Sequence, residues 1–185
     1  ADGEAQCFAV RRGELEGRLN AEFYRAEYRL LLKRIRSRYP SIGPLSKAAE
    51  IVCGPFGSAI TLDDYVTQGV PLLRISNIAR DGSLDLEDVV FLSDEKASVL
   101  AGTQVRKGDL AISQRGTIGM PAVISDAFPV FNISANLIAI RQLEGFKPEY
   151  VQLILASDMG ARQISRLQSG QVHPKITTDD IAGLL

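Results

Sequence analysis

The sequence has no tryptophan, a single histidine and only two cysteines among 185 residues. Cys7 and Cys53 are far apart, and neither belongs to a Cys-x-x-Cys pair. They cannot form a disulfide framework, which fits a reducing, cytosolic setting. One histidine and two separate cysteines are also too few for a His/Cys metal site, so we expect neither a metal nor a cofactor.

Long apolar runs are missing as well. No stretch reaches the roughly 18 consecutive apolar residues of a membrane-spanning helix, so no membrane association is expected. The first residues, Ala1 to Glu4, have neither the basic nor the apolar region of a secretory signal, and we expect a cytoplasmic protein. Because the chain stops abruptly on Leu184 and Leu185, we expect it to be a piece of a longer protein.

An excess of charge of either sign is absent too. Twenty-one Lys and Arg face 22 Asp and Glu, which gives a net charge of −1. This balance excludes a histone-like coat but leaves room for a local basic patch. The hydrophobic fraction of 45% is the globular average, and the length predicts either one ordinary domain or one domain with a helical appendage.

The appendage is a predicted helix from Asn20 to Tyr39, within an N-terminal linker and helix over residues 1–42. Asn20 is a good N-cap, and Pro40 ends the helix. The 3.6-residue period places apolar side chains on one stripe, namely Tyr24, Tyr28, Leu31, Leu32, Ile35 and Tyr39. A second stripe, roughly 100° away, carries Arg25, Arg29, Lys33 and Arg36. It is either a solvated flank or a surface facing phosphates or a partner.

Residues 43–185 have a different texture, in which short apolar runs alternate with Gly, Pro, Asn and Asp. The predicted strands are 70–78, 89–92, 110–113, 121–124 and 133–141. The predicted helices are 93–100, a long one from 147 to 169 that Gly160 weakens, and a final turn over 179–184. This pattern predicts an α/β (α+β) domain, with a curved, mostly antiparallel sheet and flanking helices.

A catalytic set is hard to find in this domain. His173 is the single candidate base, but the sequence has no Gly-x-Ser-x-Gly nucleophile elbow. His173 is therefore left as a ligand or DNA contact, or as an exposed loop side chain. Asp88, Asp94 and Lys96 faintly suggest a metal-dependent nuclease, in which carboxylates would hold a hard cation. Ser93 to Glu95 is also an ordinary helix start, so this reading stays an alternative.

Polar side chains of the types that read base edges follow several predicted elements. Arginine can contact guanine O6 and N7, and Asn or Gln can contact adenine N6 and N7. The candidate DNA contacts are Arg74, Asn77, Gln114, Arg115, Thr117, Gln171, His173 and Lys175. The same residue types also occur in any polar loop, so composition alone does not decide.

Three motifs in order give a resemblance. They are Gly54 to Ser58 with Tyr65 and the stretch Gly69–Ile78; then Val105–Leu110 with Ser113–Gly119; and finally Ser169-Gly170 with Ile176–Leu184. Together they span about 130 residues. They resemble the target recognition domain of type I restriction–modification specificity subunits.

The resemblance implies a domain that docks on double-stranded DNA and reads half of a split target in the major groove. Its partners would be modification and restriction subunits, or fused domains, with adenine-N6 methylation carried out on a flipped base. This chain itself would not be an enzyme. It would be half of a specificity subunit or the recognition domain of a fused methyltransferase–nuclease.

Two further expectations accompany this reading. The acidic segment from Asp81 to Glu95 should face away from DNA, because phosphates repel carboxylates. Besides the nuclease, a protein-interaction module that works through the helix from Asn20 to Tyr39 remains an alternative function.

Overall fold

The computed structural model describes residues 8–169 and 174–185. The chain divides after Ile42 into two compact units. The first contains two short 3-10 segments, η1 (Arg12–Glu14) and η2 (Ala21–Tyr24), and one helix, α1 (Ala26–Arg38). In the described part of the chain, each helix is too short or too polar to traverse a lipid bilayer.

The helix of the first unit starts later than predicted. Asn20 precedes η2 instead of capping α1, and its side chain makes no capping hydrogen bond. The backbone then extends at Arg25, with a ψ of 139°, before α1 begins. One cause is Tyr24, whose hydroxyl donates to the Arg18 carbonyl at 2.8 Å and accepts from the Glu16 N–H at 2.9 Å. The buried Tyr24 side chain therefore packs against the loop that precedes it, and Tyr24 is not part of α1.

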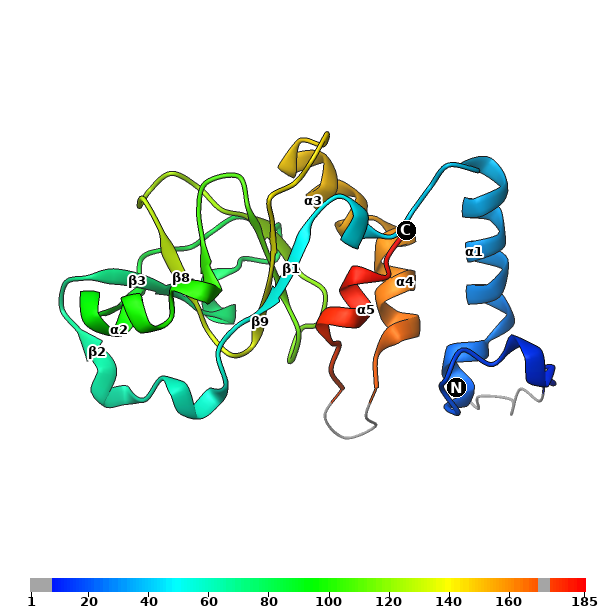
Figure 1. Ribbon diagram of the computed structural model, residues 1–185, viewed down its shortest axis with the longest axis horizontal. Helices are drawn as coiled ribbons and strands as arrows, with labels where there is room; N and C mark the ends of the chain where they lie inside the picture. Colours follow the sequence, from blue (N-terminus) through cyan, green and yellow to red (C-terminus); the bar gives the residue numbers. More distant parts are fainter. Residues whose placement is uncertain (1–7, 170–173) are drawn as a thin grey trace. The chain divides into compact units, whose positions relative to one another are not determined.

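The second unit is built on two sheets (Figure 1). One has the order β1 (Glu50–Cys53), β9 (Leu137–Arg141), β6 (Leu110–Ser113) and β7 (Pro121–Val123), all antiparallel. The other has the order β2 (Tyr65–Val66), β4 (Val90–Leu92), β3 (Val70–Leu73), β8 (Phe131–Ile133) and β5 (Gln104–Val105). Its β3–β8 pair alone is parallel. The predicted α/β class with mostly antiparallel strands is confirmed, but the predicted single sheet is two.

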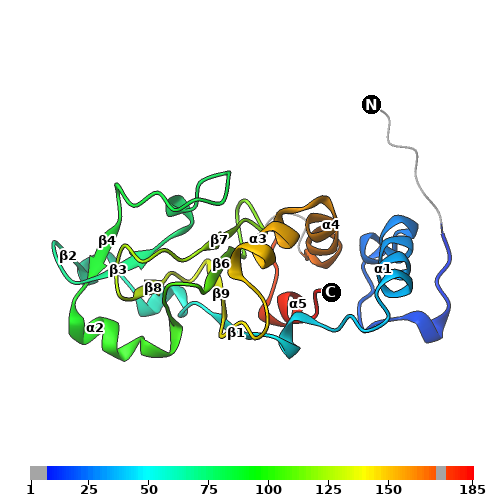
Figure 2. The same ribbon diagram turned by 90° about the horizontal axis from the view of Figure 1, so that it is seen from above.

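Four helices complete this unit: α2 (Asp94–Val99), α3 (Pro148–Ala156), α4 (Asp158–Leu167) and α5 (Thr178–Ala182). Figure 2 shows β6 and β9 between the second sheet on one side and α3, α4 and α5 on the other. Successive side chains of a strand point to opposite faces. In β9, Ala139 packs into the core shared with the second sheet, whereas Ile138 and Ile140 pack into the core under the helices.

Two predicted elements are each divided in the structure. The predicted strand 133–141 is the end of β8 and the whole of β9, separated by a turn in which Leu137 N–H donates to the Ser134 carbonyl at 3.1 Å. The predicted long helix breaks at Ser157, whose Oγ accepts from the Gly160 N–H at 3.3 Å and caps α4. Tyr150 in α3 and Ala161 in α4 are exposed.

The predicted strand 70–78 is also too long. β3 ends at Leu73, and Ile75–Asn77 form a 3-10 turn. The Asn77 Oδ1 accepts from the Arg74 N–H at 3.0 Å, which removes that N–H from any sheet ladder. This turn carries two of the candidate DNA contacts.

Candidate nucleic-acid interface

The ends of several strands meet at one edge of the second unit. β9 is antiparallel to both β1 and β6, so its first residue lies beside their last ones. Gly54 N–H donates to the Leu137 carbonyl at 2.9 Å, just after β1, and Gln114 N–H donates to the Asn136 carbonyl at 3.0 Å, just after β6. Figure 1 shows the chain after β1 and the β8–β9 connection both turning at the lower side of the view.

The second sheet reaches the same place through β8. Ser134 N–H donates to the Leu73 carbonyl at 2.9 Å, which sets the end of β3 beside the β8–β9 connection. We call the set of segments 53–58, 74–77, 114–119, 134–136 and 174–176 the loop edge. It includes residues from every region in which candidate DNA contacts were predicted.

Arg115 and Lys175 are paired at the loop edge. The two residues form an antiparallel bridge, and the adjacent Ile176 N–H donates to the Gln114 carbonyl at 3.2 Å. Lys175 also exchanges two backbone hydrogen bonds with Ser169, at 2.9 and 3.0 Å. Both cationic side chains are exposed, so backbone pairing holds two positive charges side by side in solvent.

Thr117 belongs to the same group. It is exposed in the loop between β6 and β7, and Ser113 fixes that loop from below. The Ser113 Oγ donates to the Thr117 carbonyl and accepts from the Met120 N–H, the latter at 3.0 Å. Gly116 and Gly119 have φ of 70° and 82°, a region that favours glycine. The loop is therefore a hydrogen-bonded turn from which Arg115 and Thr117 extend into solvent.

The side chain of Asn77, a predicted DNA contact, is hydrogen-bonded within the protein. Its side chain is buried, and both ends of the amide are used within the protein. The Oδ1 accepts from the Arg74 N–H, and the Nδ2 donates to the Asp85 carbonyl at 3.0 Å. An amide bonded at both ends in this way holds the turn closed, and the contact of Asn77 with DNA stays an untested prediction.

The side chain of Gln114, another predicted DNA contact, is also hydrogen-bonded within the protein. The side chain is buried, and its Nε2 donates to the Ala135 carbonyl at 2.5 Å and to the Cys53 Sγ at 3.3 Å. Its backbone also bonds both neighbouring segments, through Asn136 and Ile176. Gln114 therefore positions the loop edge and does not present an amide to solvent.

Arg74 is less enclosed than Asn77 and Gln114. It is half-buried, and one terminal nitrogen, Nη2, donates to the Asp88 carbonyl at 2.7 Å. The remaining predicted contacts, Gln171 and His173, lie outside the described residues. The structure thus brings together Arg115, Thr117 and Lys175.

The backbone of the acidic segment 81–95 contacts the turn 74–77 of the loop edge. The Asp85 and Asp88 carbonyls accept from Asn77 and Arg74. The Gln152 Nε2 donates both to the Gly82 carbonyl at 2.9 Å and to the carbonyl of Pro121, the first residue of β7, at 3.2 Å. That the acidic side chains of this segment face away from DNA stays a prediction.

Three exposed side chains of the loop edge were missed. Asn136 projects from the β8–β9 connection, and Phe56 and Ser58 follow β1, with Phe56 90% exposed. The sequence could have indicated Phe56, because a phenylalanine flanked by glycines and a proline lies in a loop, whereas apolar rings are normally buried. Asn136 carried no such signal, since the sequence placed it inside a continuous strand.

The residues of the nuclease alternative have structural partners. The Lys96 Nζ lies 3.0 Å from Asp64 Oδ1. The Thr61 N–H and the Lys96 ammonium hold the pKa of the Asp64 carboxyl below its usual value. Asp94 is in the first turn of α2, capped by Ser93. Among the described residues, no group of three His, Cys, Asp or Glu side chains is placed to hold a metal ion.

Comparisons with known proteins give a fold but no sequence relative. No protein-family model matches the chain, and no curated protein matches it. Among solved structures, a chain of a type I restriction–modification complex has a TM-score of 0.57 at 17% identity; the match covers 85% of this chain and 38% of that one. The HsdS subunit from Thermoanaerobacter tengcongensis gives a TM-score of 0.54 at 16% identity, with the same coverages.

A third structure extends the likeness to a fused enzyme. The type IIG restriction endonuclease BpuSI has a TM-score of 0.57 at 12% identity, over 88% of this chain and 26% of the enzyme. At these identities the shared property is the fold. The chain therefore has a fold found in an HsdS specificity subunit of a type I restriction–modification system and in a type IIG enzyme, and it spans 38% of the first two chains that it matches.

Proposed function

We propose that residues 43–185 form a DNA target recognition domain of a restriction–modification system, with residues 1–42 as its linker and helix. The domain reads part of a duplex target for an associated adenine-N6 methyltransferase and endonuclease, which lie in partner subunits or in a fused domain. Catalysis belongs to those partners, and the cytoplasm is the compartment that this role requires. The fold likeness and the motifs of the loop edge support the proposal together.

The observation that carries the proposal is the pairing of Arg115 with Lys175. Sixty residues of chain separate them, yet their backbones form one bridge and both side chains are exposed. An arginine can grip guanine O6 and N7 in the major groove, and a lysine can contact guanine or phosphate. Thr117 and Asn136 add a hydroxyl and an amide at the same edge, and Phe56 adds an apolar surface for a thymine methyl group.

The experiment is a selection of bound duplexes from a randomised DNA library, using the full chain. We expect enrichment of a short sequence, above a non-specific background with a Kd on the order of 10⁻⁴–10⁻⁶ M. Arg115→Gln with Lys175→Gln should abolish the enrichment, because each good base contact contributes about 1–3 kcal/mol of discrimination.

The matched control is Arg106→Gln with Lys147→Gln, which removes the same charge from exposed side chains. Arg106 precedes β6 and Lys147 follows β9, so both lie at the ends of these strands opposite the loop edge. The control should keep the enriched sequence. No enrichment by the unaltered chain, or equal loss in both double variants, would overturn the proposal.

A further inference from the structure

Positive charge is concentrated in the first unit. Residues 1–42 contain nine Lys and Arg and six Asp and Glu, whereas residues 43–185 contain 12 and 16. The near-neutral chain is thus a basic short unit joined to a moderately acidic larger one. The site described above lies on the acidic unit and leaves the basic one without an assigned ligand.

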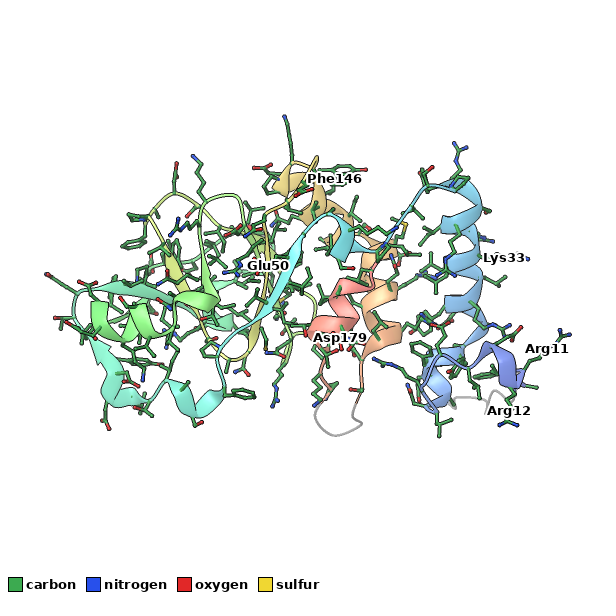
Figure 3. The ribbon with its side chains drawn as sticks, in the orientation of Figure 1. Arg11, Arg12, Lys33, Glu50, Phe146 and Asp179 are labelled. Carbon is green, nitrogen blue, oxygen red and sulfur yellow. The ribbon has the colours of Figure 1, made fainter. Side chains whose placement is uncertain are left out.

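The basic side chains of α1 form a straight stripe. Arg29, Lys33 and Arg36 recur at four and three residues, which places them on one helix face over about 10 Å. All three are exposed, and Arg25 extends the row at the residue that precedes the helix. Figure 3 shows Lys33 projecting outward from α1.

Acidic neighbours neutralise only the first part of this stripe. Arg29 pairs with Glu14 at 2.9 Å, and Arg25 lies 3.7 Å from Glu27. Within residues 8–169 and 174–185, no ion pair is found for Lys33 or Arg36. The same holds for Arg34 and Arg38, which lie on a different side of the helix. Cations near a helix C-terminus interact favourably with the helix dipole by about 0.3–1 kcal/mol each, but four within six residues also repel one another.

We infer that this stripe binds the phosphate backbone of duplex DNA without regard to sequence. The inference rests on the proposed function for the identity of the ligand and adds a second, separate contact surface to it. Protein–protein interface cores are depleted in charged residues, whereas protein–DNA interfaces are strongly positive. A row of exposed cations that acidic neighbours neutralise only at its first part therefore fits a polyphosphate. DNA offers one phosphate per about 3.4 Å of axis on each strand, so a row of about 10 Å passes several of them.

The α1 stripe and the loop edge would contribute differently to DNA binding. Phosphate contacts position a protein and supply affinity for any sequence, while base contacts supply the choice of sequence. A basic unit joined directly to the recognition domain would also raise the local concentration of DNA at the loop edge. The larger unit, which carries 16 Asp and Glu against 12 Lys and Arg, has the greater need of such a contribution.

The test compares two double variants of the full chain that remove equal charge from α1. Lys33→Gln with Arg36→Gln removes the two stripe cations for which no ion pair is found among the described residues, and Arg34→Gln with Arg38→Gln removes two cations from the other side of the helix. Glutamine is a good helix former, and circular dichroism checks that the helix persists. The readout is the affinity for a duplex of random sequence over a series of salt concentrations.

We expect the stripe variant to lose affinity at 0.1 M salt by at least about tenfold, with a salt slope shallower by about two. The sequence preference in the library selection should stay unchanged. The Arg34 and Arg38 variant should lose markedly less. Equal losses in both variants would reduce the effect to net charge and overturn the inference, as would unchanged binding by the stripe variant, the result expected if the stripe instead serves an acidic protein.

The outcomes for the two proposals are distinguishable. If the stripe variant binds random duplex normally while the Arg115 and Lys175 variant loses its target, the recognition proposal stands and the phosphate stripe falls. If the chain enriches no sequence but its affinity for random duplex depends on the stripe, the reverse holds. A chain that binds no duplex at all would overturn both.

Discussion

The side chain of Gln114 donates a hydrogen bond from Nε2 to the carbonyl of Ala135 at 2.5 Å. This contact joins the end of β6 to the connection between β8 and β9, and so to the second sheet. Because the same nitrogen also reaches the Cys53 Sγ at 3.3 Å, one buried amide ties together three segments of the loop edge. The exposed Arg115 next to it has a fixed position as a result.

Replacing that amide tests its positioning role. Gln114→Ala empties the buried site of the amide and leaves the half-buried Ala135 carbonyl without this donor, which costs about 1–3 kcal/mol of the free energy of unfolding. Urea denaturation measures the loss. In the library selection the variant should weaken binding while enriching the same sequence as the unaltered chain, since the amide does not reach solvent. A changed sequence would mean that Gln114 reads a base after all.

Asn77→Ala tests the second buried amide. The change removes the acceptor of the half-buried Arg74 N–H and the donor to the carbonyl of the exposed Asp85, so we expect a loss of about 1–3 kcal/mol in total. Thermal and urea unfolding measure it. Ser76→Ala, one residue away and exposed, is the control and should change stability little. Equal stability of the two variants would contradict the closed turn seen here.

Gly54→Ala tests the close approach of two segments at the loop edge. A Cβ at Gly54 would overlap the carbonyl oxygen of Ser134, so the β8–β9 connection must move, at a cost of about 1–3 kcal/mol. Gly57→Ala is the matched control, because a Cβ there meets nothing within 4 Å. Chemical denaturation should separate the two variants clearly. If Gly54→Ala is as stable as the control, the two segments are not in contact.

Acid should destabilise the contact between Asp64 and Lys96. The folded chain lowers the pKa of Asp64 from 3.8, mainly through the Thr61 N–H and then through Lys96. A lowered pKa means that the carboxylate stabilises the fold above the unfolded value and that this contribution disappears as the pH falls from about 4 towards the folded value. Unfolding measured between pH 5 and pH 2.5 should therefore show a smaller loss for Asp64→Asn than for the unaltered chain.

A second variant checks the cause of that shift. Lys96→Gln removes the ammonium but keeps the Thr61 hydrogen bond to Asp64, so the acid loss should move to a somewhat higher pH without disappearing. An identical pH dependence in all three chains would show that the Asp64 carboxyl has no linked role in stability.

The sequence by itself determined the local features, because their causes lie within a few residues. Ser93 was expected to cap a short helix, and its Oγ accepts from the Lys96 N–H at 3.2 Å. Pro40 was expected to end the helix of the first unit, and α1 ends at Arg38. The α/β class and the mostly antiparallel strands also followed from the alternation of short apolar runs with turn residues.

Only the tertiary structure decided which polar side chains are exposed to solvent and which are buried and hydrogen-bonded. Asn77, Gln114 and Arg115 have the same kind of sequence surroundings, yet the first two are buried and bonded while the third is exposed. Whether an amide faces solvent depends on which carbonyl, such as that of Ala135, folding brings against it from a distant part of the chain. The division of the sheet in two, and the pairing of Arg115 with Lys175, are likewise long-range choices, made when separate apolar faces are buried together.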